Sequence, residues 1–200
     1  MRAGILPSGN PPESLYSNYH FSNCTSMTIT LHAWTLDDKP ALIALCNAVD
    51  RTFLSDRLPE PYTEADANWW LGMVAENEGK EGVWRSIWAD GDLVGSISVE
   101  RKDGDENKVG ELGYMILTPW WSKGIGTEAV RQICEIATRE LGLKQITTMV
   151  FEGNRASERV LEKNGFRLEE TKSGAIVKDG KVMDVRVYGY ESCSKDMNRP

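Results

Sequence analysis

The chain has 200 residues, of which 40% are hydrophobic, enough for one α/β domain with a core of its own. Its net charge of −7 argues against a nucleic-acid-binding protein, which usually presents a basic face, and suits a cationic partner. We found neither an apolar run long enough to span a membrane nor a signal peptide, and therefore expect a cytoplasmic protein that binds no membrane.

The cysteines and histidines indicate the redox state of the thiols and which metal sites and catalytic triads the chain could form. The four cysteines lie far apart, without a Cys-x-x-Cys pair, so we expect reduced thiols at Cys24, Cys46, Cys134 and Cys193. With His20 and His32 as its two histidines, the chain is poorly supplied for a histidine-based zinc site or a Ser-His-Asp triad. We expect no metal.

Residues 1–26 are rich in Pro, Ser, Asn and Gly, which predicts a mobile N-terminal extension, and residues 192–200 are expected as a C-terminal tail. Residues 27–191 are then one domain. Its first strand is predicted over residues 28–34 because apolar and β-branched residues alternate there. A helix should follow from Asp37 or Asp38, with inward-facing residues Leu42, Ala44, Leu45, Cys46 and Val49.

Residues 52–62 contain Pro59 and Pro61 and are predicted as a loop. Thr63 and Asp66 approximate a capping box, so a second helix should run from there through Asn77. Its expected buried side consists of Trp69, Trp70, Met73 and Val74.

Two strands, Gly82–Ala89 and residues 93–100, are predicted around a hairpin turn at Asp90-Gly91-Asp92. In the first strand, Trp84 and Trp88 share one face and Val83 and Ile87 share the other. A strand that is apolar on both faces is expected to be buried on both. Residues 101–108 are predicted as a polar turn.

The central stretch begins as an apolar strand at Gly110, stops at Pro119 and restarts as a helix after Gly124-Ile125-Gly126. The helix shows one apolar face, made of Ala129, Val130, Ile133, Ala137 and Leu141. Free N–H groups at a helix start attract an anion, and glycines let a bulky phosphate come close, so we expect a pyrophosphate here. Two alternatives stay open at this point: a tight turn without a ligand, and a dinucleotide site with Ala129 in place of the third glycine.

A strand over residues 144–151 is predicted to lie parallel to the central one. A helix over residues 155–164 follows, ended by Gly165. Residues 166–171 and 182–190 should close the sheet as an antiparallel pair around Asp179-Gly180.

Residues 154–166, taken with the Gly-x-Gly stretch about thirty residues earlier, resemble the GNAT superfamily of acetyl-CoA-dependent N-acetyltransferases. The similarity is strongest to the branch of ribosomal-protein N-terminal and spermidine acetyltransferases, and covers residues 27–191. It implies an α/β fold with a mixed central sheet of about six to seven strands, helices on both faces, and parallel strands that splay at the cofactor site. It also implies transfer of acetyl from acetyl-CoA to a primary amine by direct attack in a ternary complex. The acceptor would be a peptide or protein N-terminus or a small amine such as a polyamine, and the enzyme a monomer or homodimer.

The resemblance assigns cofactor contacts by position. Pyrophosphate would meet the N–H groups of Lys123, Gly124, Ile125, Gly126 and Thr127, and the pantetheine arm would pair with the backbone of Met115, Ile116 and Leu117. Asn154 matches the asparagine that meets the arm, and Ser157 lies one helical turn later. Where relatives carry Gln or Arg before the glycines, this chain has Trp121, which puts a side-chain phosphate contact there in doubt.

Catalysis requires a base, since alkyl amines hold their proton to about pH 10 and α-amino groups to about pH 8. Glu111 resembles the base glutamate of several relatives, with Glu76, Glu60 and Asp56 as alternatives. The place of the family's acid tyrosine holds Leu161, so we prefer Ser157 as the acid, with Tyr114, Tyr188 or water as alternatives. By analogy, the helix pair and its loop would cover the acceptor through Phe53, Asp56, Arg57 and Tyr62.

Two rival functions remain. A nicotinamide-dependent oxidoreductase needs an acidic residue at a strand end about twenty residues past the glycines, but Glu140 falls within the helix. A non-catalytic module that binds acetyl-CoA is favoured by Trp121 and by the missing tyrosine. Thiol release with an amine acceptor separates that module from an enzyme.

Overall fold

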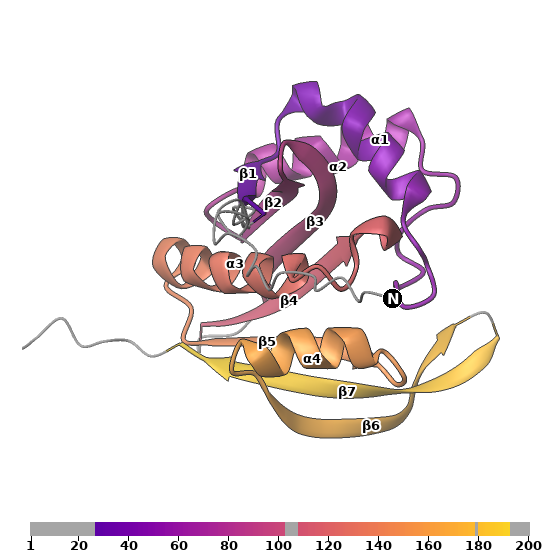
Figure 1. Cartoon of the computed structure of the whole chain (residues 1–200), viewed down its shortest axis with the longest axis vertical. Coiled ribbons are helices and arrows are strands. Elements are labelled where there is room, and N and C mark those ends of the chain that lie inside the picture. Colours follow the sequence, from indigo (N-terminus) through magenta and orange to yellow (C-terminus); the bar gives the residue numbers. More distant parts are fainter. Residues whose placement is uncertain (1–26, 103–107, 179, 193–200) are drawn as a thin grey trace, which may run out of the picture.

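The computed structural model describes residues 27–102, 108–178 and 180–192 (Figure 1). The expected N-terminal extension lies outside these ranges, as do Cys24, Cys193 and nearly all of the expected tail. Its helices and strands, in chain order, are β1 (Ile29–Ala33), the 3-10 turn η2 (Leu36–Asp38), α1 (Lys39–Ala48), α2 (Glu64–Asn77), β2 (Gly82–Ala89), β3 (Asp92–Arg101), β4 (Val109–Ile116), η3 (Thr118–Trp120), α3 (Ile125–Leu141), β5 (Gln145–Phe151), α4 (Arg155–Lys163), β6 (Arg167–Lys178) and β7 (Lys181–Glu191).

The seven strands form one mixed sheet in the order β1-β2-β3-β4-β5-β7-β6, which confirms the predicted fold class. Strands β1 to β4 are antiparallel neighbours, and so are β5, β7 and β6. The two halves meet where β4 runs parallel to β5, and this pairing covers Val109–Glu111 against Gln145–Thr147. The contact between the halves of the sheet is therefore short.

Two hydrophobic clusters cover opposite faces of the first half. The apolar face of α3 packs on Val83, Ile87 and other residues of β2 to β5, and the fully buried Leu161 of α4 joins the same cluster. On the other face, α1 and α2 pack around Trp84. β2 is thus buried on both sides, as its sequence predicts. Figure 1 shows α3 and α4 on the near side of the sheet.

The α2 start is confirmed: Thr63 and Asp66 form the capping box, and the helix ends at Asn77. For two residues of the helical layer the prediction of burial is wrong. The Trp69 residue is 71% exposed, because α2 buries Ala67, Leu71 and Val74, and a residue two positions after Ala67 lies on the opposite side of a helix. Ala44 is exposed as well, since α1 buries Leu42, Leu45 and Cys46. α1 begins at Lys39, after the 3-10 turn.

The closing hairpin is longer than predicted, because β6 continues past residue 171 to Lys178. The register with β7 shifts between Lys172 and Ile176, and the Gly174 N–H donates to Asp184 Oδ1 at 2.8 Å. This irregularity lets pairing resume, so the hairpin end reaches the loop between α1 and α2.

Candidate functional site

The edge of β4 that faces β5 is left unpaired along its second half. The Thr148 hydroxyl donates to the Leu112 carbonyl at 2.8 Å, one residue beyond the last parallel pair. On the opposite edge, the Leu117 N–H donates to Val94 O at 2.9 Å. Backbone groups in a strand alternate between its two edges, so the N–H and C=O of Tyr114 and Ile116 face away from β3. No strand among the described residues pairs with them there, and we call this segment the open edge of β4.

The register refines the prediction for the pantetheine arm. The Ile116 N–H lies on the open edge, but the Leu117 N–H is already bonded to β3 and the backbone of Met115 faces β3 too. Tyr114, which the sequence-based prediction of cofactor contacts omits, has its backbone groups on the open edge as well. Alternation along a strand could have found it, had the pairing with β3 been known.

Trp121 has a defined structural role. Its Nε1–H donates to the Ile116 carbonyl at 2.7 Å, which satisfies one of the backbone groups on the open edge. The residue that departs from the family pattern therefore ties the turn after β4 back onto β4. Its indole N–H is therefore engaged within the protein.

The start of α3 is an exposed set of backbone donors. Gly124 precedes it with φ 82°, and the Glu128 N–H makes the first internal bond, to Gly124 O at 3.1 Å. The N–H groups before Glu128 have no partner within the helix, and the helix dipole adds positive potential there. A Cβ on Gly124 would meet no atom within 4 Å, so the space beside it is open. This arrangement fits a pyrophosphate.

Gly126 serves packing as well as approach. A Cβ there would lie 3.4 Å from Ile116 Cδ1 and 3.4 Å from Val160 Cγ2, so α3 sits against β4 and α4 at this point. The Asn164 side chain adds a hydrogen bond from α4 to Thr127 O at 3.1 Å. Lys123 lies with Nζ 4.6 Å from the centre of the Trp120 ring, and its role toward a phosphate stays a prediction.

The first turn of α4 comes close to the open edge. Asn154 caps the helix by accepting the Ser157 N–H at 3.1 Å. The Ser157 hydroxyl lies 2.7 Å from the Tyr114 phenol oxygen. Burial raises the pKa of Tyr114 to about 12, although the hydrogen bond with Ser157 opposes this effect. Leu161 is completely buried, so the position of the family's tyrosine belongs to the core here.

Glu111 lies at the last residue pair before the strands separate. Leu112 points into the α3 cluster, so the half-buried Glu111 points to the face that carries α2. Glu100 is its direct neighbour on β3, and Glu100 Oε1 accepts from Trp84 Nε1 at 3.0 Å. Glu111 and Ser157 therefore approach the open edge from opposite faces of the sheet. Glu111 could therefore contact an acceptor on one face of the sheet while Ser157 contacts a leaving group on the other.

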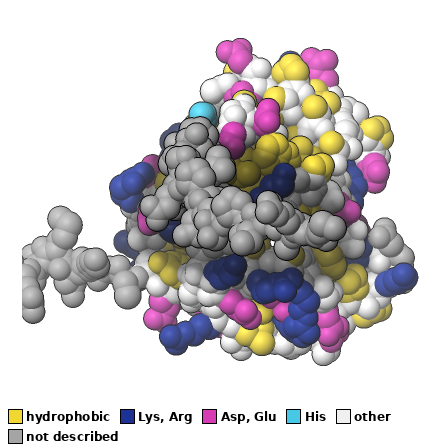
Figure 2. Space-filling view, in the orientation of Figure 1, with side chains coloured by type: hydrophobic (Ala, Val, Ile, Leu, Met, Phe, Trp, Pro, Cys, Tyr) yellow, Lys and Arg dark blue, Asp and Glu magenta, His cyan; other side chains and the backbone are white. Residues whose placement is uncertain are grey.

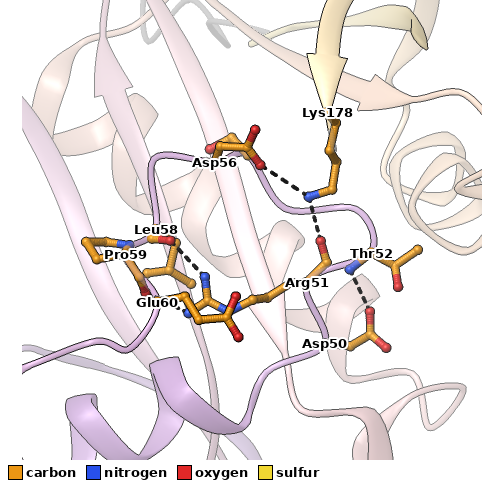
Figure 3. Close-up of a pocket in the computed structure, with 9 residues that line it drawn as sticks. Asp50, Arg51, Thr52, Asp56, Leu58, Pro59, Glu60 and Lys178 are labelled. Atoms are coloured by element: carbon orange, nitrogen blue, oxygen red, sulfur yellow. Dashed lines mark hydrogen bonds and ion pairs between the residues drawn. The ribbon is translucent and has the colours of Figure 1, made fainter. Parts of the chain in front are cut away.

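A pocket of about 510 Å³ lies in the loop between α1 and α2 (Figure 3), lined by Asp50, Arg51, Thr52, Ser55, Asp56, Leu58, Pro59, Glu60 and Lys178. Lys178 reaches it from the end of β6, and its buried ammonium donates to Arg51 O at 2.7 Å and to Leu54 O. The Asp56 carboxylate is 3.7 Å from the same ammonium. The Lys178 Nζ also lies 5.8 Å from the centre of the Phe151 ring, at the end of β5.

The predicted acceptor contacts do not all lie at this pocket. Asp56 and the alternative base Glu60 line this pocket. Tyr62 is buried in the cluster of α1 and α2, where burial raises the pKa of its phenol. The half-buried Phe53 and the exposed Arg57 do not line the pocket, and Glu76 lies on the outer side of α2 beside Trp69.

Basic side chains gather near α4 on the surface. Figure 2 shows Lys and Arg side chains, with Asp and Glu side chains among them, over the half of the molecule that contains this helix, whose exposed residues include Arg155, Arg159, Glu162 and Lys163. Because α4 packs beside the start of α3, the basic side chains of α4 lie on the same side of the molecule as the backbone donors described above.

Other features concern metals, thiols and membranes. In the described ranges, no group of three or more His, Cys, Asp and Glu side chains could hold a metal ion. Cys46 and Cys134 are free, buried thiols. No helix within these ranges has both the length and the apolar character needed to cross a membrane.

The chain was compared with known proteins. Residues 28–167 match the acetyltransferase (GNAT) domain family, and the chain therefore belongs to this family. It is 34% identical over 114 residues to a putative ribosomal N-acetyltransferase of Bacillus subtilis, YdaF, a match that covers 57% of this chain and 60% of that protein. It is 30% identical over 97 residues to an uncharacterized N-acetyltransferase of the same organism, YoaA, covering 48% of this chain and 54% of the relative.

The matches thus span little more than half the length of these two curated relatives. Among solved structures, a RimL ribosomal-protein alpha-N-acetyltransferase in complex with coenzyme A superposes with a TM-score of 0.74 at 20% identity. The superposition covers 82% of this chain and 94% of that one. At this identity the likeness concerns the fold.

Proposed function

We propose that this protein is an N-acetyltransferase that moves the acetyl group of acetyl-CoA to a primary amine. The observation that carries the proposal is the open edge of β4, which has the free N–H groups of α3 beyond one end and Glu111 and Ser157 on opposite faces. Membership of the GNAT family supports it.

Each part of the site has a task in this proposal. Acetyl-CoA supplies an activated acetyl thioester when bound. The backbone from Lys123 to Thr127 holds its pyrophosphate, and the Asn154 side chain and the open-edge groups of Tyr114 and Ile116 hold the amide-bearing arm. A backbone N–H on the open edge, directed at the thioester oxygen, stabilises the negative charge that develops there.

Glu111 removes the proton from the acceptor ammonium, so that the amine nitrogen can form its bond to the acetyl carbon. The carbon–sulfur bond breaks, the attacking nitrogen loses its second proton to solvent, and the sulfur leaves as a thiolate that accepts a hydrogen bond from the Ser157 hydroxyl. A thiol has a pKa near 8.5, so this assistance lowers the barrier without being indispensable. Glu111 and Ser157 lie on opposite faces of the sheet, which suits attack from one side and departure on the other.

The acceptor class follows from charge and from the relatives. The Asp56 and Glu60 side chains are 67% and 75% exposed at the pocket, although Asp56 lies 3.7 Å from Lys178 Nζ and Glu60 lies 3.7 Å from Arg51 Nε. Exposed carboxylates suit a cationic acceptor, such as a polyamine or a peptide N-terminus. RimL is named a ribosomal L7/L12 alpha-N-protein acetyltransferase and YdaF a putative ribosomal N-acetyltransferase, which favours a protein N-terminus as the first acceptor to test.

The test has two readouts on one protein sample. At a hundred times its dissociation constant, acetyl-CoA should stabilise the fold by about 2.7 kcal/mol, or roughly 5 to 10 °C in melting temperature. Thiol release should then appear with members of a panel of peptides, polyamines, antibiotics and amino acids. Stabilisation without release across the panel would favour a non-catalytic module, and stabilisation by a nicotinamide dinucleotide alone would contradict the proposal.

A further inference from the structure

We propose that Tyr114 is a positioning residue, whose phenol holds the Ser157 hydroxyl so that its hydrogen points to the thiol sulfur of coenzyme A. The inference rests on the proposed function, since it needs the sulfur to lie beside Ser157. It adds a residue that sequence reasoning named merely as an alternative acid, and assigns it a different task.

The contact joins two parts of the chain that border the open edge. Tyr114 comes from β4 and Ser157 from α4, and their oxygens are 2.7 Å apart. The Ser157 backbone is held separately, because its N–H is bonded to Asn154 Oδ1. The Tyr114 ring packs against the α3 cluster. Both ends of the hydrogen bond are therefore fixed before any ligand binds.

The direction of this hydrogen bond decides what Ser157 can do. A hydroxyl has one hydrogen and two lone pairs, so a Ser157 that donates to Tyr114 has no hydrogen left for a ligand. The phenol is the stronger acid of the two and therefore the better donor. When Tyr114 donates, Ser157 accepts through one lone pair and keeps its own hydrogen for another acceptor.

Proton affinities show that Tyr114 is no proton source for the thiolate. Burial raises its pKa to about 12, whereas a thiol titrates near 8.5. Transfer from this phenol to a thiolate would therefore be unfavourable by roughly three orders of magnitude. A raised pKa favours the protonated phenol, which suits a group that donates its hydrogen to Ser157.

The neighbouring charges are already paired. Glu158, the residue after Ser157, is buried, and its carboxylate accepts from Arg155 at 2.7 Å and from Arg186 at 2.9 Å. The pair with Arg186 holds α4 to β7, and the pair with Arg155 lies within α4. The orientation of the Ser157 hydroxyl thus depends on Tyr114 rather than on this carboxylate.

The first experiment uses binding alone. Calorimetry compares coenzyme A with desulfo-coenzyme A between pH 6 and pH 9. The parent protein should prefer coenzyme A increasingly as the thiol ionises, by roughly tenfold or more, since hydrogen bonds to charged groups are the stronger ones. Ser157→Ala should abolish this preference. Tyr114→Phe should reduce it roughly three- to tenfold, with desulfo-coenzyme A bound as in the parent.

The second experiment is a double-mutant cycle on acetyl transfer. Tyr114→Phe should lower kcat by roughly three- to tenfold, with an unchanged acceptor KM. In the Ser157→Ala background the same substitution should have no further effect, because Tyr114 acts through that hydroxyl. Losses that add in the double variant would overturn the proposal, and so would a fall in desulfo-coenzyme A affinity equal to the fall in kcat.

Failure of this inference can be told apart from failure of the proposed function. Equal affinity of the parent for the two ligands at every pH, with acetyl transfer intact, would overturn the role of Tyr114 and leave the enzyme standing. A parent that binds neither ligand would contradict the proposed function, and this inference with it. Tyr188→Phe removes a phenol from β7, and loss of the coenzyme A preference in that variant instead would also overturn it.

Discussion

The two sides of the open edge are built by different means. On the proposed cofactor side, the groups that matter belong to the backbone: the N–H groups at the start of α3, and those of Tyr114 and Ile116. On the proposed acceptor side, side chains hold the loop in place. Arg51 donates to Leu58 O and Pro59 O, and Lys178 donates to the loop across 127 residues of sequence.

This difference has consequences for substitution. A binding site made of backbone groups tolerates side-chain substitutions that leave φ and ψ unchanged. It loses affinity for its ligand where a new Cβ occupies the ligand's space. A loop held by a few buried side chains depends on each of them, and can acquire another specificity when they change. Four substitutions test this contrast, from the largest expected effect to the smallest.

Glu111→Gln removes the basic oxygen next to the open edge while it keeps the size of the side chain. General base catalysis contributes a hundredfold to ten-thousandfold, so kcat should fall within roughly that range. The affinity for acetyl-CoA should hardly change, and part of the rate should return at high pH, where more acceptor amine is already deprotonated. Steady-state kinetics against pH measure this. Glu100→Gln is the matched control on β3, and an equal loss in that variant would transfer the base role to Glu100.

Gly124→Ala tests the backbone side, with Gly142→Ala as its control at the other end of α3. Both glycines have positive φ, 82° and 63°, and in both cases a Cβ would meet no protein atom within 4 Å. Each substitution should therefore cost about 1 to 2 kcal/mol of unfolding free energy through left-handed strain. Calorimetry should show weaker coenzyme A binding for Gly124→Ala alone. Equal affinity in the two variants would mean that this turn does not receive the phosphates.

Lys178→Met tests the side-chain side, with the exposed Lys181→Met on the same hairpin as its control. The buried ammonium satisfies the Arg51 and Leu54 carbonyls, so its loss should cost about 1 to 3 kcal/mol in chemical denaturation. The acceptor KM should rise, and the affinity for coenzyme A should stay as in the parent. If coenzyme A binding weakened instead, the hairpin would belong to the cofactor side.

The smallest effect is expected at Glu128, in the first turn of α3. The hydrogen bond from Arg131 lowers the pKa of this carboxyl from 4.5 to about 2. A lowered pKa contributes stability above pH 4.5, and this contribution is lost as the pH falls toward 2. The pair is largely exposed, so the gain is below about 1 kcal/mol. Glu128→Gln should flatten the acid limb of the unfolding curve slightly, whereas an unchanged limb would show that the pair contributes nothing.

The sequence predicted what local chemistry determines. The Gly-x-Gly turn, the Thr63 capping box and the two-faced burial of β2 follow from residue types within a few positions of one another, and the structure confirms them. Trp69 and Ala44 were misplaced because their helices bury one narrow face, and hydrophobicity alone does not say which face.

The rest depends on contacts between distant residues. The position of Tyr114 on the open edge requires the register of β4 with β3, and its contact with Ser157 requires the packing of α4. From the sequence alone, Trp121 indicates only that a side-chain phosphate contact is missing. Its hydrogen bond to the Ile116 carbonyl becomes evident only in the structure. Lys178 gave no signal in the sequence, because one lysine in a strand is ordinary and its partners are carbonyls far along the chain.

The short parallel pairing of β4 with β5 also has a mechanical consequence. Three residue pairs join the two antiparallel halves of the sheet, and the hydroxyls of Thr147 and Thr148 donate hydrogen bonds to Gly110 O and Leu112 O. The Tyr114–Ser157 and Asn164–Thr127 hydrogen bonds also join the two halves, so the halves are held together beyond this short pairing as well. Hydrogen exchange should slow at the amides of residues 145–147 when coenzyme A bridges the two halves.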